Sequence, residues 1–89
     1  MTLYLVSYDI ADSKRWRKVH KIAQTYGRTL QFSVFLCAIT ETQKVQMLTK
    51  LLDVTTLDDR LLVVNLGTGN GVQQFARDPT QGWMPLHIT

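Results

Sequence analysis

The chain has 89 residues, is 45% hydrophobic and carries a formal net charge of +3. A chain this short holds one core, so we expect a single domain over residues 1–89, and the composition excludes a disordered protein. No apolar run approaches the ~20 residues of a membrane span. The N-terminus also lacks the basic region of a signal peptide, and we therefore expect a cytoplasmic protein.

The charge is distributed unevenly along the chain. Residues 13–40 contain six basic residues and no acid, whereas the rest contains four basic and all seven acidic residues. A concentrated positive field attracts polyanions, so this asymmetry favours a nucleic-acid or phosphate-binding surface.

The first half of the chain predicts a strand followed by a helix. Residues 3–10 are rich in aromatic and branched side chains, as in a central strand. Asp12 is placed to cap a helix over residues 14–26, and Gly27 is placed to end it. The apolar side chains of this helix recur at helical spacing on one face: Trp16, Val19, Ile22, Ala23 and Tyr26.

The pattern changes to period two from Leu30 to Ile39, which predicts the longest strand, either as one piece or folded into a hairpin whose turn the sequence does not locate. Thr40 and Gln43 then fit a capping box. The helix that follows has an apolar stripe of Val45, Leu48, Leu51 and Leu52. Residues 55–59 form a polar connection to another strand, 60–66.

The C-terminal part begins with the Gly67–Gly71 loop, whose spacing does not fit a nucleotide-binding motif. Residues 84–88 are consistent with a short closing strand that Pro85 restricts to a sheet edge. The order of elements predicts an α+β fold, a ferredoxin-like βαββαβ sandwich with both helices on one face.

Asp9 is the first candidate for chemistry, because it lies where a buried strand reaches the surface. A carboxylate at such a position can bind Mg²⁺, an ion that prefers oxygen ligands and keeps several waters. The alternative is a turn residue that accepts backbone N–H bonds, as Asp often does. Asp12 is better explained as a helix cap.

The basic residues of the first helix form the second candidate. By helical geometry, one face away from Trp16 gathers Lys14, Arg17, Lys18 and Lys21. Arg15 points elsewhere, toward the Asp9 end, where it could reach a bound phosphate. A merely solvated face would normally mix signs, so the absence of acids favours phosphate binding.

The remaining chemistry-bearing residues are isolated. Ser33 lacks a base that would make it a nucleophile, and Phe35 could stack a nucleic-acid base but fits core packing better. His20 and His87 suit core or sheet roles, and Cys37 in its apolar run suits an inert buried thiol. No Cys/His cluster supports zinc.

Several of these segments, taken in order, resemble the Cas2 family of small CRISPR-associated proteins. They are Leu5–Asp12, Lys14–Val19, Tyr26–Arg28 and Gln31–Phe35. The close match covers residues 3–37, residues 38–66 agree only in pattern, and the C-terminal third carries no recognised motif. Trp16 stands where relatives often have a basic residue, and the Gly67–Gly71 and Trp83 regions also differ.

This resemblance implies a symmetric homodimer and a metal-dependent endonuclease acting on single-stranded RNA or double-stranded DNA in spacer acquisition with the Cas1 integrase. Asp9 would hold Mg²⁺ together with Asp9 of a second copy. Arg15, Arg17 and Arg28 match the basic positions of the family, and Ser33 and Phe35 match its strand signature. The last strand, with Leu86–Ile88 as candidate, would complete the sheet of the other subunit.

Two other functions stay open. The first is a non-catalytic dimeric scaffold that binds DNA and the integrase through the same basic surface. The second is a ribonuclease toxin with a similar ferredoxin-like dimer.

Overall fold

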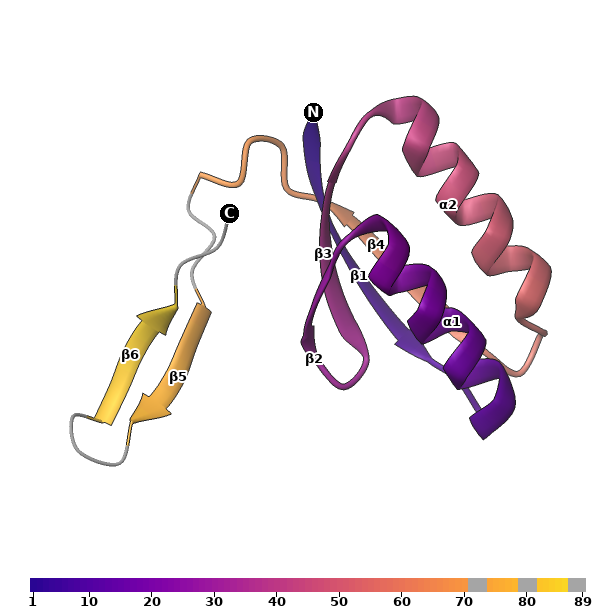
Figure 1. Ribbon diagram of the computed structural model, residues 1–89, viewed down its shortest axis with the longest axis horizontal. Helices are drawn as coiled ribbons and strands as arrows, with labels where there is room; N and C mark the ends of the chain where they lie inside the picture. The colour runs from indigo at the N-terminus through magenta and orange to yellow at the C-terminus, as the bar shows by residue number, and fades with distance from the viewer. Residues whose placement is uncertain (71–73, 79–81, 87–89) are drawn as a thin grey trace.

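A computed structural model of the protein describes residues 1–70, 74–78 and 82–86. Its main body has two layers, a four-stranded antiparallel sheet and two helices on one face of that sheet (Figure 1). The elements of this body are β1 (Thr2–Asp9), α1 (Ser13–Tyr26), β2 (Arg28–Gln31), β3 (Val34–Ile39), α2 (Glu41–Val54) and β4 (Arg60–Asn65). The strand order β2-β3-β1-β4 confirms the predicted ferredoxin-like arrangement.

Both helices begin at the caps that the sequence indicates. The Asp12 carboxylate accepts a hydrogen bond of 3.0 Å from the backbone N–H of Arg15. The Thr40 hydroxyl accepts from the N–H of Gln43, whose side chain in turn accepts from the N–H of Thr40. Each cap satisfies a backbone donor that has no partner inside its helix, which fixes where the helix starts.

Gly27 follows α1 as expected, but for a different reason from the one predicted. Its φ of −161° is extended backbone, not the left-handed conformation that usually selects glycine after a helix. A Cβ atom at this position would collide with the backbone carbonyl oxygen of Leu36. Glycine is therefore required because β3 passes directly against the end of α1.

The segment over residues 30–39 belongs to a hairpin, which confirms the second of the two predicted alternatives and rules out a single strand. The chain turns at Phe32 and Ser33, and Gln31 pairs with Val34 across the turn. A register shift between Thr29 and Gln31 lies in the same hairpin. The turn contains neither glycine nor proline, so its position could not be predicted from turn residues.

The core lies between the sheet and the helices. It contains Tyr4, Val6 and Tyr8 of β1, Phe35, Cys37 and Ile39 of β3, Val19 and Ala23 of α1, and Met47 and Leu51 of α2. Cys37 is buried as predicted, and burial raises the pKa of its thiol to about 11. The thiol is therefore protonated and unreactive at neutral pH.

The buried face of α2 differs from the predicted stripe. Val45 and Leu52 are 53% and 66% exposed, whereas Met47 is fully buried beside Leu51. Apolar residues occur on both sides of this helix, so periodicity alone does not decide which side meets the sheet. Packing against α1 and β3 decides it.

The opposite face of the sheet carries no helix. Leu5, Ser7 and Asp9 alternate with the buried residues of β1 and so point to this open face. Their register partners on β4 are Val64, Leu62 and Arg60, and Leu62 is 59% exposed. The open face is thus largely apolar and ends at Asp9.

The C-terminal part forms a second, two-stranded sheet of β5 (Gln74–Asp78) and β6 (Gly82–Leu86), which Figure 1 shows beside the main sheet rather than in it. The sequence predicted a closing strand here at 84–88 and missed β5. Pro85 pairs with Phe75. Residues 87–89, including His87 and most of the Leu86–Ile88 candidate, lie outside the described residues. Among the helices described, none is long and apolar enough to cross a membrane.

Candidate functional site

Asp9 is the last residue of β1 and is exposed, as the sequence predicted. Its register partner is Arg60, the first residue of β4. It lies at the end of the open apolar face, and the loop that leads into α1 follows it directly. Asp9 therefore lies at the end of the open face, and three residues separate it from the start of the basic helix α1, which packs on the opposite face of the sheet.

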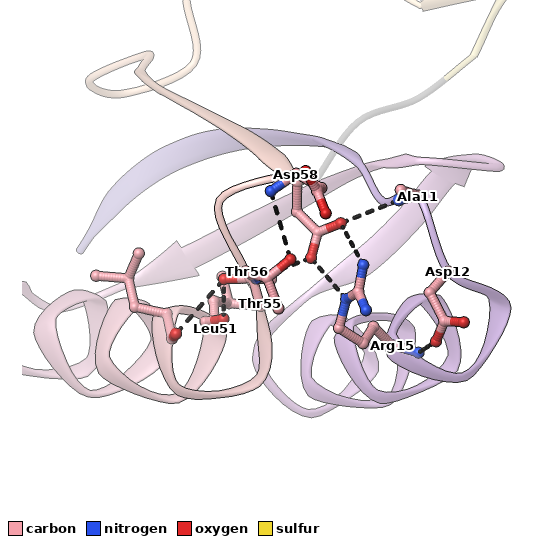
Figure 2. A network of polar contacts seen from close by, with 9 residues as sticks. Ala11, Asp12, Arg15, Leu51, Thr55, Thr56 and Asp58 are labelled. Carbon is pink, nitrogen blue, oxygen red and sulfur yellow. Dashed lines mark hydrogen bonds and ion pairs between the residues drawn. The ribbon is translucent and has the colours of Figure 1, made fainter.

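Asp59 fixes the loop that follows Asp9. Its side chain is fully buried and accepts hydrogen bonds from the backbone N–H groups of Ala11 at 3.0 Å and Thr56 at 2.9 Å. Arg15 adds two more, from Nε at 2.9 Å and Nη2 at 3.2 Å. Dashed lines in Figure 2 mark the contacts that Ala11 and Arg15 make with this carboxylate.

The paired guanidinium, followed by the Ala11 N–H, lowers the pKa of the Asp59 carboxyl far below its ordinary value. A buried carboxylate with four donors is held as an anion in one orientation. These contacts hold together two segments that lie next to Asp9: the start of α1, which follows it in the chain, and the start of β4, which pairs with it in the sheet. Asp59 could not be predicted as a partner of Arg15, because 44 residues separate the two and no local pattern links them.

Arg15 forms an ion pair with Asp59 within the protein. The sequence predicted it as a phosphate ligand and did not predict this ion pair. Nε and Nη2 are committed to Asp59, and 26% of the side chain is exposed. The hydrogen bond to Asp59 also raises the pKa of the Arg15 guanidinium. Phosphate binding by Arg15 stays a prediction, now beside an evident structural role.

The other predicted basic residues are exposed. They are Lys14, Arg17, Lys18 and Lys21 on α1, and Arg28 at the start of β2. In the part of the chain that the structure describes, the ion pairs involve Arg15 and Lys44 alone, so these five cations have no carboxylate partner there. Nucleic-acid binding by this surface stays a prediction.

A groove between the helices extends that basic surface. It has a volume of about 360 Å³ and is lined by Lys18 and Lys21 of α1, by Lys50 of α2 and by largely apolar residues between them. The Lys50 ammonium lies 5.1 Å from the ring centre of Tyr26. Lys50 was not among the predicted site residues, because α2 as a whole carries both signs of charge.

The supporting residues take structural positions. Phe35 is fully buried, so in this structure it packs in the core and offers no surface for a base. Ser33 lies in the β2–β3 turn, where its carbonyl oxygen accepts from the N–H of Tyr8 and its hydroxyl accepts from Trp16. The sequence predicted a core or sheet role for His20. It lies instead half-buried on α1, where it hydrogen-bonds Tyr8.

A metal ion would find one suitable carboxylate here. Among residues 1–70 and the described strands of the C-terminal hairpin, no group of three Asp, Glu, His or Cys side chains converges. Asp9 is exposed and its carboxylate makes no hydrogen bond among these residues, so its oxygens are available to Mg²⁺, which keeps several waters. One chain therefore offers Mg²⁺ a single exposed carboxylate at this position.

Comparison with known proteins points to one family. The family model for CRISPR associated protein Cas2 matches residues 1–72. The chain is 42% identical over 72 residues to a CRISPR-associated endoribonuclease Cas2 from Rhodospirillum rubrum, covering 78% of this chain and 69% of the relative. It is 33% identical to another from Geobacter sulfurreducens, covering 80% and 76%.

Solved structures agree with these matches. Streptococcus pyogenes Cas2 superposes with a TM-score of 0.70 at 29% identity, covering 76% of this chain and 90% of that one. A chain of a partial Cas6-RT-Cas1–Cas2 complex superposes with a TM-score of 0.68 at 25% identity, covering 78% and 82%. The family model's match ends at residue 72, just before β5, and no motif was recognised in the sequence beyond that point.

Proposed function

Since the chain belongs to the Cas2 family of CRISPR-associated proteins, we propose that it is an Mg²⁺-dependent endonuclease that acts in spacer acquisition. The observation that carries this proposal is Asp9, an exposed carboxylate at the end of an open apolar sheet face and separated by three residues from a helix that contains basic residues and no acid. The names of the relatives, which include both an endoribonuclease and an endonuclease, support phosphodiester hydrolysis.

The proposed active form is a homodimer. Burying Leu62 and Val64 of one copy against another copy would remove apolar surface from water, at ~25 cal/mol per Å². Because Asp9 lies at the end of the same face, such packing would bring two carboxylates together. A C-terminal strand reaching the other subunit's sheet would add to this interface, as the position of β5 and β6 outside the main sheet permits.

Within that dimer each group has a distinct task. The two Asp9 carboxylates would hold Mg²⁺, which when bound supplies a more acidic water and neutralises charge on the phosphodiester. Lys14, Arg17, Lys18, Lys21 and Arg28 would bind flanking phosphates. Asp59 and Arg15 would keep the loop after Asp9 in place.

Cleavage by the purified protein tests the assignment. We expect Asp9→Asn to reduce cleavage of single-stranded RNA or duplex DNA by at least ~100-fold, an effect comparable to losing one key electrostatic group. Asp53→Asn, at an exposed aspartate of α2, is the matched control and should cleave like wild type. Cleavage by Asp9→Asn at the wild-type rate, or without any divalent ion, would contradict the proposal.

A non-catalytic scaffold for the Cas1 integrase is the rival function, and it is favoured by a related chain occurring in a complex with Cas1. It predicts that Asp9→Asn supports spacer acquisition as well as wild type does. Replacing Lys14, Arg17, Lys18 and Lys21 with Gln would then abolish acquisition, while Asp9→Asn would not.

The dimer has its own test. Leu62→Lys places a charge on the open face and should shift the protein toward monomer in light scattering and reduce cleavage in parallel. Leu57→Lys changes a more exposed leucine in the connection before β4 and should leave the dimer intact. An unchanged mass for Leu62→Lys would refute this interface.

A further inference from the structure

Three aromatic rings stack at the surface where α1 meets the β2–β3 turn. The ring centres of Trp16 and Phe32 are 4.5 Å apart with an interplanar angle of 18°, and those of Trp16 and His20 are 4.6 Å apart at 13°. Trp16 and His20 are one helical turn apart on α1, whereas Phe32 comes from the turn. None of these residues entered the proposed active site.

Hydrogen bonds hold this aromatic stack (Phe32, Trp16 and His20) in place. The indole N–H of Trp16 donates to the hydroxyl of Ser33 at 3.3 Å. The Tyr8 hydroxyl donates to the carbonyl oxygen of Phe32 at 3.3 Å and hydrogen-bonds Nδ1 of His20 at 3.1 Å. The rings are therefore oriented before any ligand arrives, so little conformational entropy is lost on binding.

Phe32 leaves one end of the stack open. It is 74% exposed although one face of its ring lies against Trp16, which places its other face in water. The turn itself does not require an aromatic side chain at this position, since most residues are compatible with such turns. An exposed Phe32 ring stacked on two other rings therefore points to a planar ligand.

The electrostatic surroundings indicate the class of ligand. Arg17 follows Trp16 in α1, and Lys21 follows His20. Both cations are exposed, and residues 13–40 contain no acid. Aromatic rings among cations are typical of sites for single-stranded nucleic acids, in which phosphates meet the cations and bases stack on the rings.

We propose that the Phe32–Trp16–His20 stack is a binding platform for an unpaired base of single-stranded nucleic acid, with Phe32 as the contact ring. A base inside a duplex has both faces covered by its neighbours, so the platform selects single strands or unpaired ends. The inference rests on the proposed function only in taking nucleic acid as the ligand. Stacking does not depend on the sugar, so RNA and DNA strands share the required chemistry.

Binding measured without metal separates this inference from cleavage. Affinities are measured by fluorescence anisotropy in EDTA. The labelled ligands are oligouridylate, oligothymidylate, a duplex and an abasic strand, all of equal length. Phe32→Leu should bind both base-bearing single strands about tenfold more weakly, within the range for a lost base–aromatic stack. Its affinity for the abasic strand and the duplex should be unchanged, because their phosphates still meet the same cations.

Two variants serve as controls. Phe32→Tyr keeps a ring and should retain wild-type affinity, and Leu57→Ala removes another exposed apolar side chain and should change nothing. In a Trp83→Phe background, Trp16 is the remaining tryptophan of the chain, and its fluorescence should be quenched by the base-bearing strands alone. Far-UV circular dichroism of each variant establishes that it is folded.

Clear outcomes would overturn the inference. Wild-type affinity of Phe32→Leu for single strands would do so, as would an equal loss on the abasic strand. Unchanged nucleic-acid binding together with weaker binding to a purified Cas1 partner would instead assign the stack to a protein interface. Loss of cleavage by Asp9→Asn is an independent result, because no step of this binding test needs the metal.

Discussion

The two helices pack on the same face of the sheet and have the same length, yet their exposed sides differ. Each has 14 residues and buries two of them completely, Val19 and Ala23 in α1 and Met47 and Leu51 in α2. α2 has Glu41 in its first turn and pairs it with Lys44. α1 has no acid in its first turn but two cations, Lys14 and Arg15.

Cations at a helix N-terminus oppose the helix dipole and are normally unfavourable. In α1 this arrangement is offset for Arg15 by the buried Asp59, but not for Lys14. The fold needs only the inner faces of the helices, which are alike. The outer faces differ because, on our proposal, one of them binds phosphates.

Removing a core side chain from either helix should cause the largest effect. Met47→Ala should lower the free energy of unfolding by ~2–5 kcal/mol, the usual cost of a deleted buried methionine side chain. Val19→Ala should cost less, because fewer methyl groups are lost. Urea denaturation measures both, and a negligible effect at either position would break the equivalence of the inner faces.

Removing the charges of α1 should come next and should affect binding alone. Replacing Lys14, Arg17, Lys18 and Lys21 with Gln should weaken duplex binding by ~100-fold. The slope of the logarithm of the binding constant against the logarithm of the salt concentration should become shallower by up to ~0.9 per lost contact. Lys44→Gln in α2 is the matched control, because that lysine already pairs with Glu41. Titrations at several salt concentrations measure the slope, and equal slopes would refute the proposed role of α1.

Asp59 and Glu41, the acidic partners of the two ion pairs, should contribute differently to the pH dependence of stability. The pKa of Asp59 is lowered in the folded protein, so its contribution to stability is present above the ordinary Asp pKa of ~3.9 and is lost as the pH falls below it. Urea unfolding from ~pH 5 to ~pH 2 should show this loss in wild type and reduce it in Asp59→Asn. Glu41 also has a lowered pKa but is 70% exposed, so Glu41→Gln should change the profile less.

The caps should give the smallest effect. Asp12→Ala and Thr40→Ala should each lower the free energy of unfolding by ~1 kcal/mol, since each leaves one helix donor without its partner. Replacement by Ser should largely restore stability at both positions. A much larger loss for Asp12→Ala would show that the start of α1 depends on its cap more than on Asp59.

Features that depend on nearby residues were predictable. Asp12 and Thr40 bond to groups three residues away, so their roles follow from spacing alone. Asp9 could be placed at the end of a strand because the alternation of β1 is local. The β2–β3 turn could not, since Phe32 and Ser33 carry no turn signal and their position is set by packing.

By itself, the sequence determined the two capped helices, the order of elements up to β4, the cations of α1 and the resemblance to its family. Only the tertiary structure decided that Asp59 holds Arg15, that Met47 rather than Val45 faces the core, and that Phe32 joins Trp16 and His20. The reason is the range of the interactions involved. Helix caps and alternation act within a few residues, whereas an ion pair across 44 residues exists only after the chain returns on itself.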